Sequence, residues 1–189
     1  MLKTRIRKWC LLLLLLGCCM GVQAQYSMGN TGLLNIPTAD MQKAGTFMGG
    51  GNYLPNGMTP FNFNTGNYFV NITFLSFLEL SYRCTLLKTT RYDGKKGYFQ
   101  QDRSLSARIR PIKEGKYHPA IVIGTNDPFK DTGTNYFATI YGVLTKGFSI
   151  AKGDRLALTA GYYLPLNKHS IQDGPFGGIS YSPALRRET

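Results

Sequence analysis

The chain has 189 residues, of which 22 are basic and 10 acidic, giving a formal net charge of +12. This length corresponds to one domain, and the charge favours an anionic partner. No basic run with interleaved aromatic residues is present, which argues against nucleic-acid binding.

The first 24 residues have the pattern of a secretory signal peptide. Four basic residues precede an apolar run at 10–20, and a small-residue site predicts cleavage between Ala24 and Gln25. The apolar run is shorter than the ~20 residues of a spanning helix. The alternative is a lipoprotein signal in which Cys18 is acylated. Either signal predicts export, with residues 25–189 forming one domain.

Cleavage after Ala24 changes the cysteine count and the charge of the mature chain. Cys84 is then the one remaining cysteine, so no internal disulfide and no cysteine-based metal site are expected. The leader holds four basic residues and no acidic ones, so its removal lowers the net charge from +12 to +8.

Residues 30–39, NTGLLNIPTA, lie between the leader and the first strand-like run. Gly32 permits backbone conformations closed to other residues, and Pro37 favours an extended Ile36. We expect a short, rigid, extended segment with Leu34 and Ile36 on one side, which plugs or braces the end of a β structure. The alternative is an ordinary lead-in to a sheet. A turn at 43–45 follows.

Alternating apolar and polar residues predict an all-β fold, and no window shows helical periodicity. Twelve tyrosines, eleven phenylalanines and 22 glycines suit antiparallel strands and their turns. About eight strands are expected, with a tight turn at Ser76 and Phe77 between the second and third. The predicted strands are 46–54, 67–75, 78–86, 104–112, 120–125, 136–146, 156–164 and 176–182. Membrane barrels use alternating segments of ~10 residues, whereas soluble sandwiches use shorter ones.

Three arginines are candidate ligand-facing residues. Arg108 and Arg110 project from the polar face of their strand, and Arg83 from the polar face of an earlier one. In a barrel this face would line the lumen, because arginine facing lipid costs about 2–4 kcal/mol. Guanidinium groups match carboxylates, so these residues are expected to face an anionic polysaccharide. Alternatively, they pair with Glu79, Asp102 or Glu114 and hold the wall together.

The sequence shows no catalytic or metal-binding pattern. His118 and His169 lie in expected loops, away from any nucleophile motif. Asp127 and Asp131 are better explained as turn formers than as metal ligands. We therefore expect a non-enzymatic protein without cofactor or metal.

Two stretches carry a family resemblance. The first is TGLLNIPTA at 31–39, followed by GTF at 45–47; the second is DGPFGGISY at 173–181. Both resemble YjbH-like proteins, predicted outer-membrane β-barrels of Gram-negative bacteria that are associated with exopolysaccharide export. The motif residues are Gly32, Pro37, Thr38, Ala39, Gly45, Phe176, Gly177 and Gly178.

The resemblance implies an antiparallel transmembrane β-barrel in the outer membrane, in contact with outer-membrane lipid and with other export-machinery proteins. The implied function is non-enzymatic export or assembly of exopolysaccharide. The alternative is a soluble secreted or periplasmic β-sandwich that binds a ligand. YjbH-like chains are longer, and residues 183–189 lack the terminal aromatic strand of outer-membrane barrels, so an incomplete, truncated barrel is expected.

Overall fold

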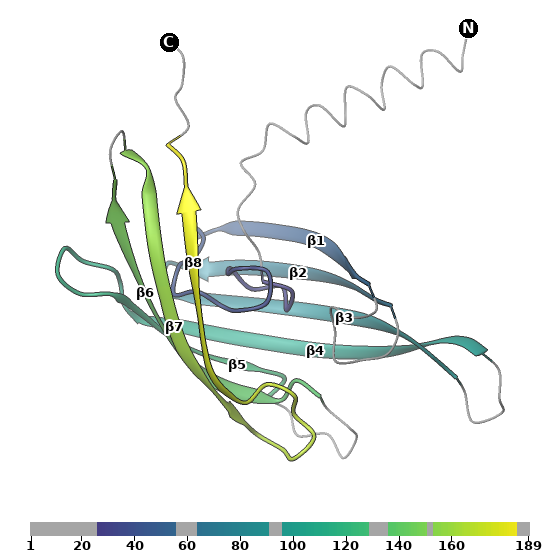
Figure 1. Cartoon of the computed structure of the whole chain (residues 1–189). Coiled ribbons are helices and arrows are strands. Elements are labelled where there is room, and N and C mark those ends of the chain that lie inside the picture. The colour runs from purple at the N-terminus through teal and green to yellow at the C-terminus, as the bar shows by residue number, and fades with distance from the viewer. Residues whose placement is uncertain (1–25, 56–63, 91–95, 129–135, 151–152, 185–189) are drawn as a thin grey trace, which may run out of the picture.

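The computed structural model describes residues 26–55, 64–90, 96–128, 136–150 and 153–184 (Figure 1). Its strands form one antiparallel sheet in which each strand pairs with its neighbours in sequence. The strands are β1 (Thr46–Leu54), β2 (Thr65–Leu75), β3 (Leu78–Thr90), β4 (Lys96–Ile112), β5 (Ala120–Asn126), β6 (Thr139–Ser149), β7 (Arg155–Pro165) and β8 (Gly174–Ser182). The prediction of an all-β fold with eight strands is confirmed.

The sheet curls into a half-barrel with one concave face (Figure 1). Within the described residues, β1 pairs with β2 alone and β8 with β7 alone, so the sheet has two open edges. This shape agrees with the expected incomplete barrel. A β-sandwich has two stacked sheets, whereas all eight described strands lie in one sheet, so the sandwich architecture of that alternative is wrong.

The predicted turns at 43–45 and 76–77 are present. Thr46 N donates to Lys43 O at 3.1 Å, and Gly45 has a φ of 78°, a conformation that glycine adopts without a steric penalty. Ser76 and Phe77 form the two-residue connection between β2 and β3.

No helix in the described part of the chain is both long enough and apolar enough to cross a membrane.

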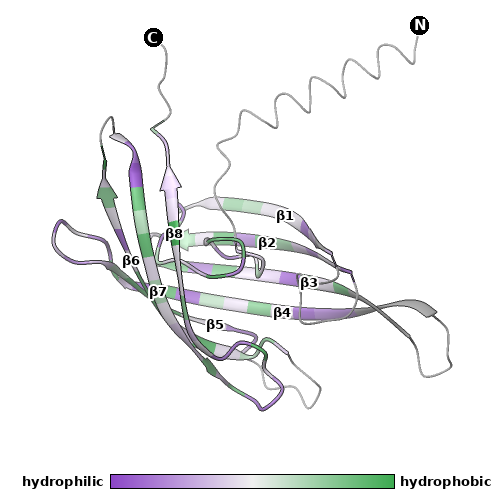
Figure 2. Cartoon of the chain, in the orientation of Figure 1, coloured by the Kyte–Doolittle hydropathy of each residue, from purple (hydrophilic) through white to green (hydrophobic). Residues whose placement is uncertain are grey.

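Side chains alternate between the two faces of the sheet, and the polar ones are buried on the concave face. In β2, Asn67, Asn71 and Thr73 are buried, whereas Ile72 between them is 41% exposed on the convex face. Figure 2 shows the resulting bands of hydrophilic and hydrophobic colour along the ribbons. The exposed apolar residues of the strands include Tyr68, Val70, Ile72, Phe74, Leu80, Tyr82, Leu105, Ile109, Ile123, Ile140, Leu144, Leu158, Tyr162, Leu164 and Ile179.

This arrangement inverts the polarity of a water-soluble domain. Soluble proteins place most polar side chains outside and apolar ones inside. The apolar core here is small and lies between β5–β8 and the N-terminal segment. Its buried residues are Ala39, Ala120, Val122, Tyr141, Val143 and Tyr163.

The N-terminal residues 26–42, which we call the plug segment, lie on the concave side of the sheet (Figure 1). The predicted extended shape of residues 30–39 was wrong. Gly32 forms an antiparallel bridge with Pro37, and Leu33 N donates to Ile36 O at 2.9 Å, so the chain folds back in a tight loop. A Cβ atom at Gly32 would lie 2.5 Å from Ile36 O, so glycine is needed there for close approach.

Candidate functional site

A buried ion pair joins β3 and β4 beneath the plug segment. Glu79 and Arg108 face each other across the two strands, and Arg108 Nη2 lies 2.9 Å from Glu79 Oε2. Both side chains are 0% exposed. Two charges removed from water in this way stabilise a fold only when further hydrogen bonds satisfy their remaining donors and acceptors.

The plug segment supplies most of those hydrogen bonds. Arg108 donates to the main-chain oxygens of Thr31, Thr38 and Asp40 at 2.9, 2.8 and 2.6 Å. Glu79 accepts from the main-chain nitrogen and hydroxyl of Thr31 at 2.8 and 3.0 Å, and from Asn71 Nδ2 at 2.8 Å. Arg108 therefore holds both arms of the 31–38 loop at once, and the ion pair anchors the loop to the wall.

Arg83 makes a second anchor on the same face. It donates to Asp102 Oδ2 at 3.4 Å and to Ser104 Oγ at 3.3 Å, and also to the sulfur of Met28. Its guanidinium carbon lies 4.2 Å from the centre of the Phe137 ring. The Met28 contact ties the start of the plug segment to the sheet.

Arg83 and Arg108 thus lie on the inner face, as their strand positions predicted, but the plug segment covers them. Both are buried, and they pair with Asp102 and Glu79, which is the wall-bracing alternative set out above. A polymer on the concave side would contact the plug segment before it reached either guanidinium. Of the three predicted arginines, Arg110 alone keeps substantial solvent exposure.

The two motifs meet in space. The side chains of Leu33 and Ile36 lie over Gly178, where a Cβ atom would be 2.6 Å from Leu33 Cδ1 and 2.8 Å from Ile36 Cδ1. The sequence predicted that Leu34 and Ile36 lie on one side of the segment. In the structure Leu33 accompanies Ile36 at this contact, and Leu34 is 58% exposed. The Phe176 ring stacks on Tyr163 with centroids 4.3 Å apart.

Pro37, Thr38 and Ala39 serve the same docking, whereas Gly177 packs against β7. Ala39 N donates to Thr145 Oγ1 at 2.8 Å, and Thr38 presents its main-chain oxygen to Arg108. Pro37 is buried in the bridge with Gly32. A Cβ atom at Gly177 would lie 3.2 Å from Thr159 O. The motifs therefore hold the plug segment on the sheet.

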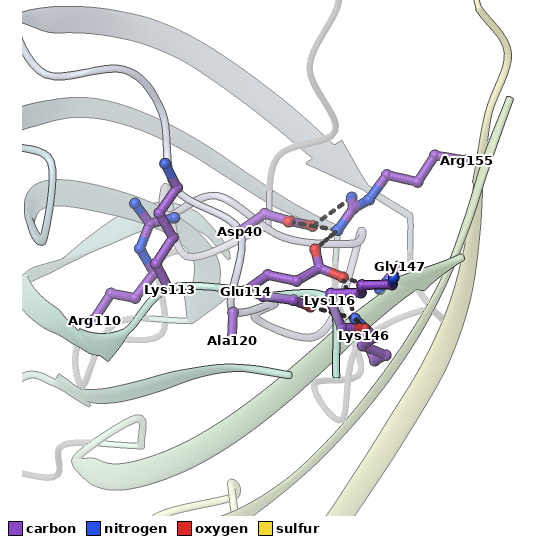
Figure 3. A pocket seen from close by; sticks show the side chains of 10 residues that line it. Asp40, Arg110, Lys113, Glu114, Lys116, Ala120, Lys146, Gly147 and Arg155 are labelled. Carbon is purple, nitrogen blue, oxygen red and sulfur yellow. Dashed lines mark hydrogen bonds and ion pairs between the residues drawn. The ribbon is translucent and has the colours of Figure 1, made fainter. Parts of the chain in front are cut away.

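A basic cleft of about 520 Å³ opens beside Asp40 of the plug segment, at the end of the sheet where β4 stops and β5 starts (Figure 3). Residues from β4, the 113–119 connection, β6 and β7 surround it. The residues lining the cleft are Asp40, Arg110, Lys113, Glu114, Gly115, Lys116, Ala120, Lys146, Gly147 and Arg155.

Arg155 joins the two carboxylates of the cleft. Its guanidinium donates to Asp40 at 3.0 and 3.3 Å and to Glu114 Oε2 at 2.9 Å. Glu114 also accepts from Gly147 N at 2.6 Å and lies 3.5 Å from Lys146 Nζ. Burial alone would raise the pKa of Glu114, but the hydrogen bond from Gly147 and the positive charges of Arg155 and Lys146 lower it overall. Glu114 was a predicted partner for the three arginines; the structure pairs it with Arg155 and Lys146 instead.

The cleft keeps an excess of positive charge. Five cationic side chains line it against two carboxylates, and both carboxylates are held by Arg155. Arg110 donates to the main-chain oxygen of Ser76 at 2.7 Å, and Lys116 Nζ lies 5.2 Å from the centre of the Tyr117 ring. Within the described part of the chain, Arg110, Lys113 and Lys116 have no carboxylate within ion-pair distance.

Other predicted residues lie either outside the described range or away from these clusters. The cleavage site at Ala24 and Gln25, Cys18 and Asp131 lie outside the described residues. Asp127 follows β5 with a φ of 49°, and its main-chain nitrogen donates to Leu105 O at 2.8 Å, which agrees with its predicted place in a turn. His118 and His169 are exposed in loops. The expectation of a protein without catalytic activity remains a prediction.

The sheet is curled and antiparallel, with a polar inner face, an apolar outer face and a segment docked inside it. These features define a protein of the β-barrel class, with the described strands forming part of the barrel. The chain belongs to the YjbH family, because that family's model, described as "Exopolysaccharide biosynthesis protein YbjH", matches residues 24–165. The matched range includes the 31–39 motif, and the 173–181 motif follows it. The family associates the chain with exopolysaccharide biosynthesis. Comparison with curated proteins and with solved structures found no match.

Proposed function

We propose that the protein is a non-enzymatic component of the outer membrane that serves exopolysaccharide export. The observation that carries this proposal is the inverted polarity of the sheet. Neighbouring strands place apolar side chains next to one another on the convex face: Ile72 pairs with Leu80, and Ile140 pairs with Leu164. All four side chains are exposed.

Lipid is the solvent that suits such a surface. Monomeric soluble proteins rarely expose apolar patches larger than a few hundred Å², whereas the outer face of a membrane barrel is an apolar band. Except for β5, the strands have nine to 17 residues. A tilted membrane-spanning strand needs about 9–11.

The open edges of β1 and β8 indicate what kind of partner the sheet requires. An unpaired strand edge in hydrocarbon leaves main-chain donors and acceptors unsatisfied, at several kcal/mol each. The strands alternate in direction along an even-numbered sheet, so β1 and β8 run antiparallel to each other. We propose that further antiparallel strands, from export-machinery partners, pair with these edges in the assembled barrel.

Cell fractionation tests the proposed location. The protein, produced with its leader, is expected in the outer-membrane fraction, with a gel mobility that changes on heating as folded barrels unfold. Deletion of the gene is expected to reduce exopolysaccharide in the medium. Recovery of all the protein from the soluble periplasm, as a monomer that needs no detergent, would overturn the proposal.

A further inference from the structure

The basic cleft has positive charge beyond what its own carboxylates neutralise. Asp40 and Glu114 are both paired with Arg155, and Arg110, Lys113 and Lys116 remain directed to solvent or to main-chain and aromatic groups. Figure 3 shows Arg110 and Lys113 on one side of Asp40, and Lys116, Lys146 and Arg155 on the other. The cleft thus presents cationic groups on two sides of one opening.

We propose that this cleft binds a carboxylate-bearing saccharide segment. The proposal rests on the exopolysaccharide function proposed above and assigns the site and the chemical class of its ligand. The guanidinium of Arg110 offers a planar set of donors that matches a carboxylate, and Lys113 and Lys116 add charge that is less geometrically demanding. The volume of about 520 Å³ lies within the ~300–1,000 Å³ of small-molecule sites.

An exposed aromatic ring beside the lining residue Lys116 favours a sugar over a simple anion. Tyr117 is 86% exposed, next in sequence to Lys116. Pyranose rings present C–H groups on their flat faces, and these pack on aromatic rings. Cations for the carboxylate and an aromatic ring for the sugar thus lie next to each other at Lys116 and Tyr117.

The position of the cleft disfavours a lipid headgroup. Arg110 is two residues beyond Arg108 and Arg155 is two residues before Ala157, so both start from concave-face positions of their strands. Asp40, which belongs to the plug segment, forms part of the cleft wall. A lipid in contact with the convex face would be on the other side of the sheet.

Calorimetric titration of the full mature protein in detergent micelles tests the proposal. The probes are trigalacturonate, neutral maltotriose, inorganic phosphate and vesicles that contain an anionic lipid. Trigalacturonate is expected to bind, and raising the salt from 0.1 to 1 M is expected to weaken binding, because the screening length falls from about 10 to 3 Å. The Arg110→Gln/Lys113→Gln variant is expected to bind at least tenfold more weakly, equivalent to about 1.4 kcal/mol.

A matched control keeps the same loss of charge outside the cleft. Lys43 and Lys168 are exposed and do not line it, so Lys43→Gln/Lys168→Gln is expected to bind within twofold of the parent protein. Equal binding of maltotriose, phosphate or vesicles, no binding of trigalacturonate, or an unchanged affinity in the cleft variant would each overturn the proposal. An outer-membrane protein that fails to bind would overturn this inference alone, and a soluble protein that binds would overturn the proposed location alone.

Discussion

Replacing Arg108 by glutamine removes the cation that joins the plug segment to the wall. Glu79 would be left as a fully buried carboxylate without its ionic partner. The main-chain oxygens of Thr31, Thr38 and Asp40 would lose their shared donor. The substitution therefore acts on both the sheet and the plug segment.

The size of the effect follows from the burial of the pair. Breaking a buried ion pair by removing one partner costs about 3–5 kcal/mol. Each buried carbonyl left without a donor adds a cost of about 1–3 kcal/mol, but detachment of the loop would let water satisfy these oxygens and limit the total. We expect Arg108→Gln to lower the free energy of unfolding by about 3–5 kcal/mol.

Arg110→Gln is the matched control, because it makes the same chemical change on the same face of the same strand. Arg110 is half-buried and makes one hydrogen bond, to Ser76 O. Its replacement is expected to cost less than about 1 kcal/mol. Urea unfolding in detergent micelles, followed by the gel mobility of unheated samples, measures both values.

Free energies of unfolding within about 1 kcal/mol of each other for the two variants would refute an anchoring role of the buried pair. A double-mutant cycle with Glu79→Gln isolates the pair itself. If the ion pair is the source of the effect, the loss in the double variant is smaller than the sum of the two single losses.

Three further predictions concern the close packing of β6, β7 and β8, the outer face of the sheet and the cleft. Gly161→Ala would place a Cβ atom 2.6 Å from Gly142 O and against the Phe176 ring. We expect it to lower the free energy of unfolding by about 1–3 kcal/mol in the same urea assay. The control Gly142→Ala, whose Cβ atom would meet open space, is expected to change that free energy by less than about 0.5 kcal/mol. Ile72→Arg is expected to cost about 2–4 kcal/mol in a bilayer and to reduce the folded protein in the membrane fraction, while Tyr117→Arg in the exposed loop leaves it unchanged; normal accumulation of the first variant would contradict a lipid-facing position. The pKa of Glu114 is lowered from its usual 4.5, so its carboxylate stabilises the fold above that pH, and this stabilisation is lost as the pH falls through the lower folded value. Between pH 6 and pH 3 the urea midpoint of Glu114→Gln is therefore expected to fall less than that of the parent protein, and parallel curves would refute this.

Strand positions could be predicted because their cause is local. A side chain changes face at every residue of a strand, so the alternation in 67–75 or 104–112 is visible without any partner. The polar face of Arg83 and Arg108 follows from the same period. β4 begins at Lys96 rather than at residue 104, because residues 100–103, QQDR, are all polar and mask the alternation in the sequence.

The shape of the plug segment could not be predicted in the same way. Gly32 and Pro37 indicated a rigid backbone but not its fold, since the bridge between them is stabilised by contacts with Glu79 and Arg108. The burial of Glu79 and Arg108 under the plug segment likewise depends on tertiary contacts. Glu79 on the polar face of its strand, next to Asn71 in the sheet, was the available signal for a buried cluster.

The basic cleft is assembled from separate parts of the chain. The strand pattern allows a pair between Arg110 and Glu114, but in the structure Arg155 bridges Glu114 and Asp40, and Lys146 lies 3.5 Å from Glu114. Nothing in the spacing of Lys146 or Arg155 indicates this position. The cleft opens where β5 begins, beside the longer strands β4 and β6. Its position therefore depends on the register of β4, β5, β6 and β7.

The contacts of the plug segment also set an order of events in folding. It precedes every strand in the sequence, yet Thr31 hydrogen-bonds 48 residues away, Ala39 106 residues away and Tyr26 137 residues away. Adjacent strands need short loops to pair, whereas these distant contacts require closure of long ones, which slows them. We therefore expect the strand hairpins to form first and the plug segment to dock last. Amides of residues 31–39 should accordingly become protected from hydrogen exchange after those of β6 and β7 in a refolding experiment.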